Sequence, residues 1–240
     1  MARASGEQSA QTDEEEMATT RGSELKVRPL SAARVDDVKT VTRGTWGATC
    51  WDLFPRYSAK QQRELGISLG PGTVEAKRRA ALAKLARRRK NSAGLVAYEG
   101  KEPVGFLSLG PRTDFSRIAH SKATPTVDDV EAWVIPCITV RRGYRGQGVA
   151  IAMLRAALEY AGDRGATAVE GYPRVSAKRL HDDFAFIGTE AMFRKAGYRK
   201  VRGILPGLPK GWAPRVTMRA TCGSSRKTSS ASPRRSRPAR

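Results

Sequence analysis

The chain has few of the residues on which nucleophilic and metal chemistry commonly depend. Its 240 residues include only three cysteines and two histidines. Cys50, Cys137 and Cys222 have neither the spacing of a metal site nor the density of a small disulfide-bonded scaffold. We interpret them as free thiols in a reducing cytoplasm. With only His120 and His181 available, we expect no metal site and no mechanism that needs several histidines.

Long apolar runs are also missing. No stretch approaches the roughly 18 apolar residues that a membrane span requires, and the first residues lack the apolar stretch of a signal peptide. We therefore expect a cytoplasmic protein without a membrane segment. The hydrophobic fraction of 40% is still enough for a core, and 240 residues suit one domain with tails.

Acidic side chains are scarce, with 23 against 44 basic ones and a formal net charge of +21. Residues 1–24 are polar, acidic and without periodicity, and we interpret them as a disordered head. Residues 221–240 are rich in serine, proline and arginine, which is typical of a disordered basic tail. Most of the positive charge therefore belongs to residues 25–220, the expected folded domain. Its field attracts anions, which could be a phosphorylated cofactor, a nucleic acid or an acidic surface.

Hydrophobic periodicity within residues 25–220 predicts an α/β domain with a partly parallel sheet. Strands are expected at 25–31, 92–110 (a hairpin), 128–140, 166–173, 199–204 and 215–220. Helices are expected at 32–43 after Ser31 as N-cap, at 51–65 with an interruption at Pro55, at 73–90, from the following loop to Gly162, and at 188–198. Pro136 lies inside an expected strand and cannot donate to a β-ladder, so we expect a bulge or a splayed edge there.

The segment "RRGYRGQGVA", residues 141–150, lies between an expected strand and an expected helix. A helix start leaves backbone N–H groups unbonded, and glycines let a phosphate approach them closely. A dinucleotide loop would need a third glycine where Ile151 stands, and a Walker loop would need a G-K-[ST] sequence, which is absent. Arg145, Gly148 and Ala150 satisfy the acetyl-CoA pyrophosphate pattern Arg/Gln-x-x-Gly-x-Gly/Ala. A glycine-rich turn with solvated arginines is the alternative.

The stretch from Ala132 to Pro173, together with "MFRKAGYRKV", resembles the GNAT superfamily of N-acetyltransferases. A bulged strand, the glycine loop, a helix, a strand and a short helix ending in "AGY" follow one another in the order of that family. The resemblance implies a mixed, mostly antiparallel sheet with a central splayed parallel strand pair, flanked by helices. It implies acetyl-CoA as cofactor and an amine as acceptor. The residues implied to hold the cofactor are Ile138, Val140, Arg145, Gly146, Gln147, Gly148, Val149, Ala150 and Ile151.

Two positions depart from the family pattern. Phe193 stands where many members have a tyrosine that acts as general acid, and Phe186 stands where an asparagine often touches the cofactor. Glu131 and Glu170, at the ends of two expected strands, are the candidate bases for deprotonating the amine. We expect direct attack by the amine rather than an acetylated Cys137, with an oxyanion held by backbone N–H groups near Ile138.

Two other functions stay open. The departures at Phe193 and Phe186 are compatible with a non-catalytic CoA-binding module. The run "KRRAALAKLARRRK" is compatible with nucleic-acid binding, although no aromatic stacking platform accompanies it. The sequence does not identify the acceptor. We expect residues 45–65 and 111–127 to select it, and the basic domain favours an acceptor that carries an acidic group.

Overall fold

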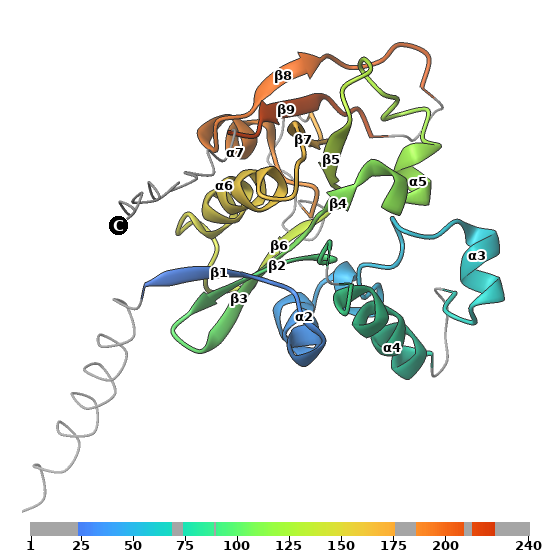
Figure 1. Ribbon diagram of the computed structural model, residues 1–240, viewed down its shortest axis with the longest axis vertical. Helices are drawn as coiled ribbons and strands as arrows, with labels where there is room; N and C mark the ends of the chain where they lie inside the picture. Colours follow the sequence, from blue (N-terminus) through green and yellow to red (C-terminus); the bar gives the residue numbers. More distant parts are fainter. Residues whose placement is uncertain (1–23, 69–73, 89, 176–185, 209–212, 224–240) are drawn as a thin grey trace, which may run out of the picture.

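A computed structural model describes residues 24–68, 74–88, 90–175, 186–208 and 213–223 (Figure 1). The predicted head and most of the predicted tail lie outside these residues. The strands are β1 (Leu25–Pro29), β2 (Gly94–Glu99), β3 (Glu102–Ser108), β4 (Gly110–Pro111), β5 (Ala132–Ile135), β6 (Ile138–Val140), β7 (Ala168–Gly171), β8 (Arg199–Arg202) and β9 (Thr217–Thr221). The α-helices are α2 (Val35–Thr42), α3 (Ala59–Glu64), α4 (Glu75–Ala86), α5 (Ser116–Ala119), α6 (Val149–Gly162) and α7 (Glu190–Lys195).

The strands form two sheets, in the orders β1-β2-β3-β6 and β4-β5-β7-β9-β8. Strands β5 and β7 are parallel, and the other pairs are antiparallel. The chain passes from one sheet to the other three times, between β3 and β4, between β5 and β6, and between β6 and β7. This arrangement confirms the predicted mixed, mostly antiparallel sheet with a central parallel pair.

The second passage occurs at Pro136 and Cys137. Before it, β5 pairs with β7 as far as Ile135 opposite Gly171, and after it β6 pairs with β3 from Ile138 opposite Leu107. Proline has no N–H to give to either neighbour, so the ladder cannot continue through position 136. The two sheets therefore part here, as the splayed edge predicted for Pro136 requires.

Helices cover both faces of the first sheet. Helix α6 packs on β1, β2, β3 and β6, and it also contacts β7, so it spans the division between the sheets (Figure 1). Helices α2 and α4 contact each other, and α2 covers the opposite face of β3 and β6. The alternation along β2 fits this sandwich, because Leu95 and Ala97 belong to the core under α6, whereas Val96 and Tyr98 belong to the core under α2.

The helix predicted for residues 51–65 is wrong in extent. A short 3-10 helix, Trp46–Thr49, precedes it, and α3 begins only at Ala59. Trp51 and Asp52 have φ angles of 50° and 58°, which are incompatible with a helix. Ser58 forms a capping box with Gln61, and this pair defines where the helix starts.

Two smaller differences concern Ser31 and the end of the domain. Ser31 makes no side-chain capping bond, and a 3-10 turn separates it from α2. At the other end, β9 runs to Thr221 and the Cys222 side chain is buried, so the folded domain extends slightly beyond residue 220.

The close contact between β7 and α7 yields a prediction on stability. The Phe193 ring lies directly on Gly171, and a Cβ atom added to this glycine would overlap the ring. We expect Gly171→Ala to lower the free energy of unfolding by about 1–3 kcal/mol or more, because a fully buried ring must move. Gly203→Ala is the matched control, since nothing lies within 4 Å of the added Cβ there. Urea denaturation measures both, and equal stabilities of the two variants would contradict this packing.

Candidate active site

One edge of β6 faces the gap between the two sheets. The Cys137 carbonyl accepts from the Ser108 N–H at 2.9 Å, and the Arg141 N–H donates to the Val104 carbonyl at 2.9 Å, so both groups face β3. Backbone groups alternate in direction along a strand. Those of Ile138 and Val140 therefore face away from β3, toward the gap.

Two of these edge groups already have partners. The Ile138 N–H donates to the Phe186 carbonyl at 2.6 Å, and the Val140 carbonyl accepts from Arg145 Nε at 3.0 Å. The Val140 N–H and the Ile138 carbonyl also lie on the edge that faces the gap, and no partner for them is found among the described residues. The Ile138 N–H is engaged and does not offer itself as an oxyanion donor in this structure.

The glycine loop leads from this edge into helix α6. Gly143, Gly146 and Gly148 have φ angles of 91°, 79° and 84°, a region that favours glycine, and nothing lies within 4 Å of a Cβ added to any of them. Gly148 is the N-cap of α6, and the Ala152 N–H bonds back to its carbonyl at 3.0 Å. The amide groups before Ala152 thus have no intrahelical acceptor and lie at the positive end of the helix.

The loop side chains stabilise this shape. Arg145 reaches back to the Val140 carbonyl, and Gln147 Nε2 donates to the Gly143 carbonyl at 2.8 Å. The first turn of α6 contains no acidic residue. The structure thus brings the nine predicted cofactor residues together as one strand edge, one loop and one helix start. A strand edge that leads into a helix start is suited to binding an extended molecule that carries a diphosphate.

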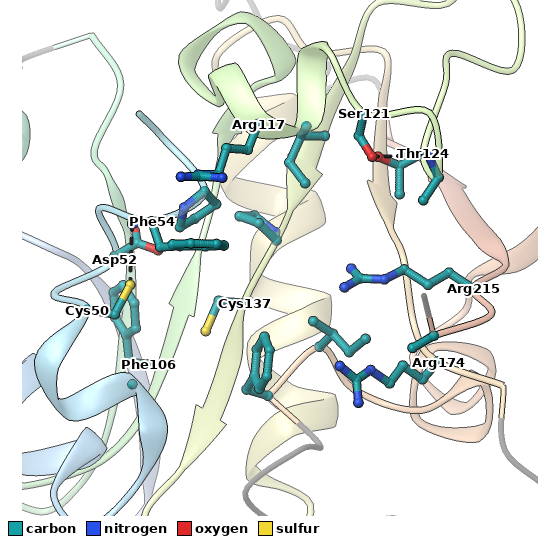
Figure 2. Close-up of a pocket in the computed structure, with 18 of the residues that line it drawn as sticks. Cys50, Asp52, Phe54, Phe106, Arg117, Ser121, Thr124, Cys137, Arg174 and Arg215 are labelled. Carbon is teal, nitrogen blue, oxygen red and sulfur yellow. Dashed lines mark hydrogen bonds between the residues drawn. The ribbon is translucent and has the colours of Figure 1, made fainter. Parts of the chain in front are cut away.

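A cavity of about 380 Å³ lies beside the point where the strand divides (Figure 2). Pro136 and Cys137 form part of its wall. The remaining wall comes from α2, the segment after η3 (Trp46–Thr49), the α5 segment, and the residues around Phe186 and Arg215. Much of the lining is apolar and includes Val38, Phe54, Phe106, Ile118, Phe186 and Ile187. Both segments predicted to select the acceptor, 45–65 and 111–127, contribute to it.

Asp52 is the carboxylate among the described residues that line the cavity. Its Oδ2 atom accepts from Arg56 Nε at 2.8 Å and from Ser108 Oγ at 2.8 Å. The other oxygen, Oδ1, is buried and has no hydrogen-bond partner within the described part of the chain. Burial raises the pKa of the Asp52 carboxyl, while Arg56 and Ser108 act in the opposite direction. The left-handed backbone at Trp51 and Asp52 is the kind of strain that concentrates at functional sites.

The two carboxylates predicted as bases lie elsewhere. Glu131 is exposed just before β5, and Glu170 is buried on β7, and neither lines the cavity. Glu170 accepts from Tyr172 Oη at 2.9 Å and from Arg219 Nη2 at 2.6 Å. Arg219 is its direct cross-strand neighbour on β9. The geometry brings neither side chain to the acceptor side, and their catalytic role stays a prediction.

Phe193, Cys137 and Cys50 lie near the gap but are poorly suited to act as a general acid or as a nucleophile. Phe193 is fully buried, and its ring packs edge-on against Tyr198 at a centroid distance of 5.1 Å. Cys137 lines the cavity, but burial raises the pKa of its thiol well above the ordinary value, and Asp52 adds to the shift. Burial likewise raises the pKa of Cys50 to about 11. His181 lies outside the described residues.

Comparison with known proteins identifies the family of the chain. A profile of the acetyltransferase (GNAT) family matches residues 59–186, more than half of the chain. The chain belongs to the GNAT acetyltransferase family. Acetyl-CoA is the cosubstrate of this family. No curated protein matches the chain.

Solved acetyltransferases are similar in structure at low sequence identity. YncA of Salmonella typhimurium, solved with acetyl-CoA, is 13% identical at a TM-score of 0.48, over 83% of this chain and 94% of that one. PaiA of Thermoplasma acidophilum, solved with coenzyme A, is 14% identical at a TM-score of 0.47, over 82% and 99%. A polyamine N-acetyltransferase of Drosophila melanogaster is 12% identical at a TM-score of 0.47, over 82% and 100%.

Within the described residues there is no group of three or more metal-ligating side chains and no helix long and apolar enough to cross a membrane. The basic run on α4 is partly used within the fold. Arg78 is buried and donates to three backbone carbonyls, Arg79 pairs with Asp36, and Arg88 pairs with Asp114.

The exposed glycine loop yields a prediction on cofactor binding. A glutamate at Gly148 would cover the amides at the start of α6 and repel a diphosphate. We expect Gly148→Glu to weaken CoA binding by roughly 100-fold or more, since an opposed like charge costs several kcal/mol. Isothermal titration with CoA measures this. Gly165→Glu is the control, because Gly165 also has a positive φ, 82°, and open space around it, but lies beyond the other end of α6. Unchanged CoA affinity in Gly148→Glu would contradict the assignment.

Proposed function

We propose that this protein is an acetyl-CoA-dependent N-acetyltransferase that moves an acetyl group to an amine by direct attack. The division of the strand at Pro136 carries the proposal. It exposes the edge of β6 that leads to the glycine loop, and it places Cys137 and Pro136 in the wall of the cavity. A donor held along β6 and α6 would thus meet an acceptor that enters from the cavity. The location in the cytoplasm stays a prediction.

The residues of the cofactor side have separate tasks under this proposal. The amides from Gly146 to Ile151 would hold the diphosphate, and the free edge groups of Ile138 and Val140 would hold the pantetheine arm. Acetyl-CoA supplies the activated acetyl thioester. Arg145 keeps the loop against the end of β6 through the Val140 carbonyl, so its side chain acts mainly by positioning.

An amine acceptor must lose a proton before it can attack. A lysine-like amine with a pKa of about 10.4 is neutral only about once in 2,500 molecules at pH 7. We assign the base to Asp52, because it lines the cavity and one of its oxygens has no partner in the described structure. Its raised pKa makes it a stronger base than an ordinary aspartate.

Direct attack also fits the state of the thiols. A nucleophilic cysteine needs a low pKa or an adjacent base, and Cys137 has its pKa raised by burial and its Sγ atom 3.8 Å from Thr139 Oγ1. Phe193 has no proton to give to the departing thiolate. The thiol of CoA, with a pKa near that of cysteine at roughly 8.5, is a good leaving group without such help.

Replacing the thiol at position 137 tests the route. We expect Cys137→Ala to keep the rate within about threefold, because no bond to sulfur forms in a direct transfer. Steady-state kinetics with acetyl-CoA and mass spectrometry of the protein are the measurements, with Cys222→Ala as the control for a buried cysteine that does not line the cavity. An acetylated protein, or a loss beyond about 100-fold in folded Cys137→Ala, would argue for a covalent route.

Substitution of Asp52 tests the base. We expect Asp52→Asn to lower kcat by roughly 10²- to 10⁴-fold and to remove the acidic limb of the pH–rate profile. Since this variant also leaves the buried Arg56 without its partner, CoA affinity should be measured as a check on folding.

Ser108→Ala is the companion variant. Ser108 lowers the pKa of Asp52 through its hydrogen bond, so its loss should raise that pKa and move the acidic limb to higher pH while most of the rate is retained. A limb that does not move in Ser108→Ala, together with full activity in Asp52→Asn, would exclude Asp52 as the base.

A further inference from the structure

Two arginines lie directly opposite each other at the rim of the second sheet. Arg174 and Arg215 form an isolated antiparallel bridge. The Val175 N–H donates to the Pro214 carbonyl at 3.0 Å, and the Val216 N–H donates to the Pro173 carbonyl at 3.2 Å. These bonds flank the bridge, so the two arginines occupy a non-hydrogen-bonded pair, the register in which opposite side chains lie closest and on the same face.

The pair brings two positively charged side chains together in the wall of the cavity. Like charges directly opposite each other in a ladder repel. Burial lowers the pKa of Arg215, and the charge of Arg174 lowers it further. Arg215 makes no hydrogen bond and no ion pair with any residue of the described structure. An anion bound beside Arg215 would give this guanidinium a charge-assisted hydrogen bond.

Both arginines belong to the acceptor cavity. Figure 2 shows their guanidinium groups extending from one side toward Cys137, with Asp52 on the opposite side. A third cation, Arg117, lies with its guanidinium 4.1 Å from the centre of the Phe54 ring. Asp52 is already paired with Arg56. Among the described lining residues, Arg174 and Arg215 are the charged side chains on that side of the cavity.

The space between these charges is apolar. Phe54, Phe106 and Phe186 line it, together with Ile118. The volume of about 380 Å³ is at the lower end of the range of small-molecule sites. The cavity thus offers an anion site, an apolar wall and a position beside the divided strand where an amine would react.

We propose that the acceptor is an amino acid with an apolar side chain, whose carboxylate binds between Arg174 and Arg215. The inference rests on the proposed acetyl transfer and deepens it. Asp52 takes one proton from the ammonium group, the freed nitrogen bonds to the acetyl carbon, and the carbon–sulfur bond of the thioester breaks. A second proton leaves the nitrogen and passes to the departing thiolate, which is released as the thiol of CoA. The apolar side chain packs on the phenylalanines of the cavity.

Matched acceptors test the need for the carboxylate. L-Phenylalanine, L-leucine and L-methionine are each compared with the amine that lacks the carboxylate: phenethylamine, isopentylamine and 3-(methylthio)propylamine. Thiol release from acetyl-CoA gives kcat/KM. We expect at least one amino acid to exceed its amine about tenfold or more, as a charge-assisted hydrogen bond predicts.

Removal of one guanidinium tests the site itself. Arg215→Met should reduce that preference to about threefold or less by lowering kcat/KM for the amino acid, mainly through KM, with little effect on the amine. Arg63→Met is the control, because Arg63 is an exposed cation on α3 that does not line the cavity. It should keep the full preference. CoA affinity reports whether Arg215→Met is folded.

A binding experiment makes the result independent of turnover. Isothermal titration of 3-phenylpropionate, 4-methylpentanoate and 4-(methylthio)butanoate into the CoA-saturated protein should show binding of at least one, lost in Arg215→Met. Failure to bind any of them, equal acetylation of amino acids and amines, or equal losses for both in Arg215→Met would overturn the carboxylate site. Absence of CoA binding would instead refute the acetyltransferase proposal.

Discussion

The absence of a hydrogen on the Pro136 nitrogen is the constraint on which the site depends. A strand with an ordinary residue there could continue from β5 into β6 within one sheet. With proline, β5 stays with β7 while β6 joins β3. Helix α6 packs against strands of both sheets. The gap that results is lined on one side by backbone N–H and C=O groups of the β6 edge. These groups are polar and directional, and leaving them buried without a hydrogen-bond partner costs free energy.

Charge is distributed around this gap in two groups with different tasks. Backbone amides and glycines at the start of α6 provide a positive end without side chains in the way. Arginine side chains provide the charge on the cavity side, where they lie among aromatic rings. Some of the other cations are paired, as Arg79 with Asp36 and Arg219 with Asp128 illustrate. The overall net charge of +21 is thus a poor guide to the ligand, whereas the position of individual cations is informative.

Features that depend on local sequence were predictable. The order strand, glycine loop and helix around residues 132–162 follows from hydrophobic periodicity and from the glycines, and Pro136 alone indicates the break in the ladder. Residues 51–58 were not predictable in the same way, because Trp51 and Asp52 adopt a left-handed conformation that is uncommon for residues other than glycine. Tertiary packing, in which the Trp51 ring is buried, overrides the local preference there.

The acceptor side was harder because its residues meet only through strand pairing. Arg174 and Arg215 are 41 positions apart in the sequence, and their opposition follows from the register of two short segments. Glu170 illustrates the converse, since its position at a strand end suggests a base, but its cross-strand neighbour Arg219 binds it. Asp52 lies in an aromatic run with no pattern that marks it as functional. Such residues are found from the fold and not from spacing.

The most direct test of the account is a crystal structure of the protein with CoA. The account predicts the diphosphate on the amides between Gly146 and Ile151, the pantetheine along the free edge of β6, and the thiol beside Cys137 at the mouth of the cavity. CoA bound at another surface, or a structure in which β6 and β7 pair directly and close the gap, would contradict it.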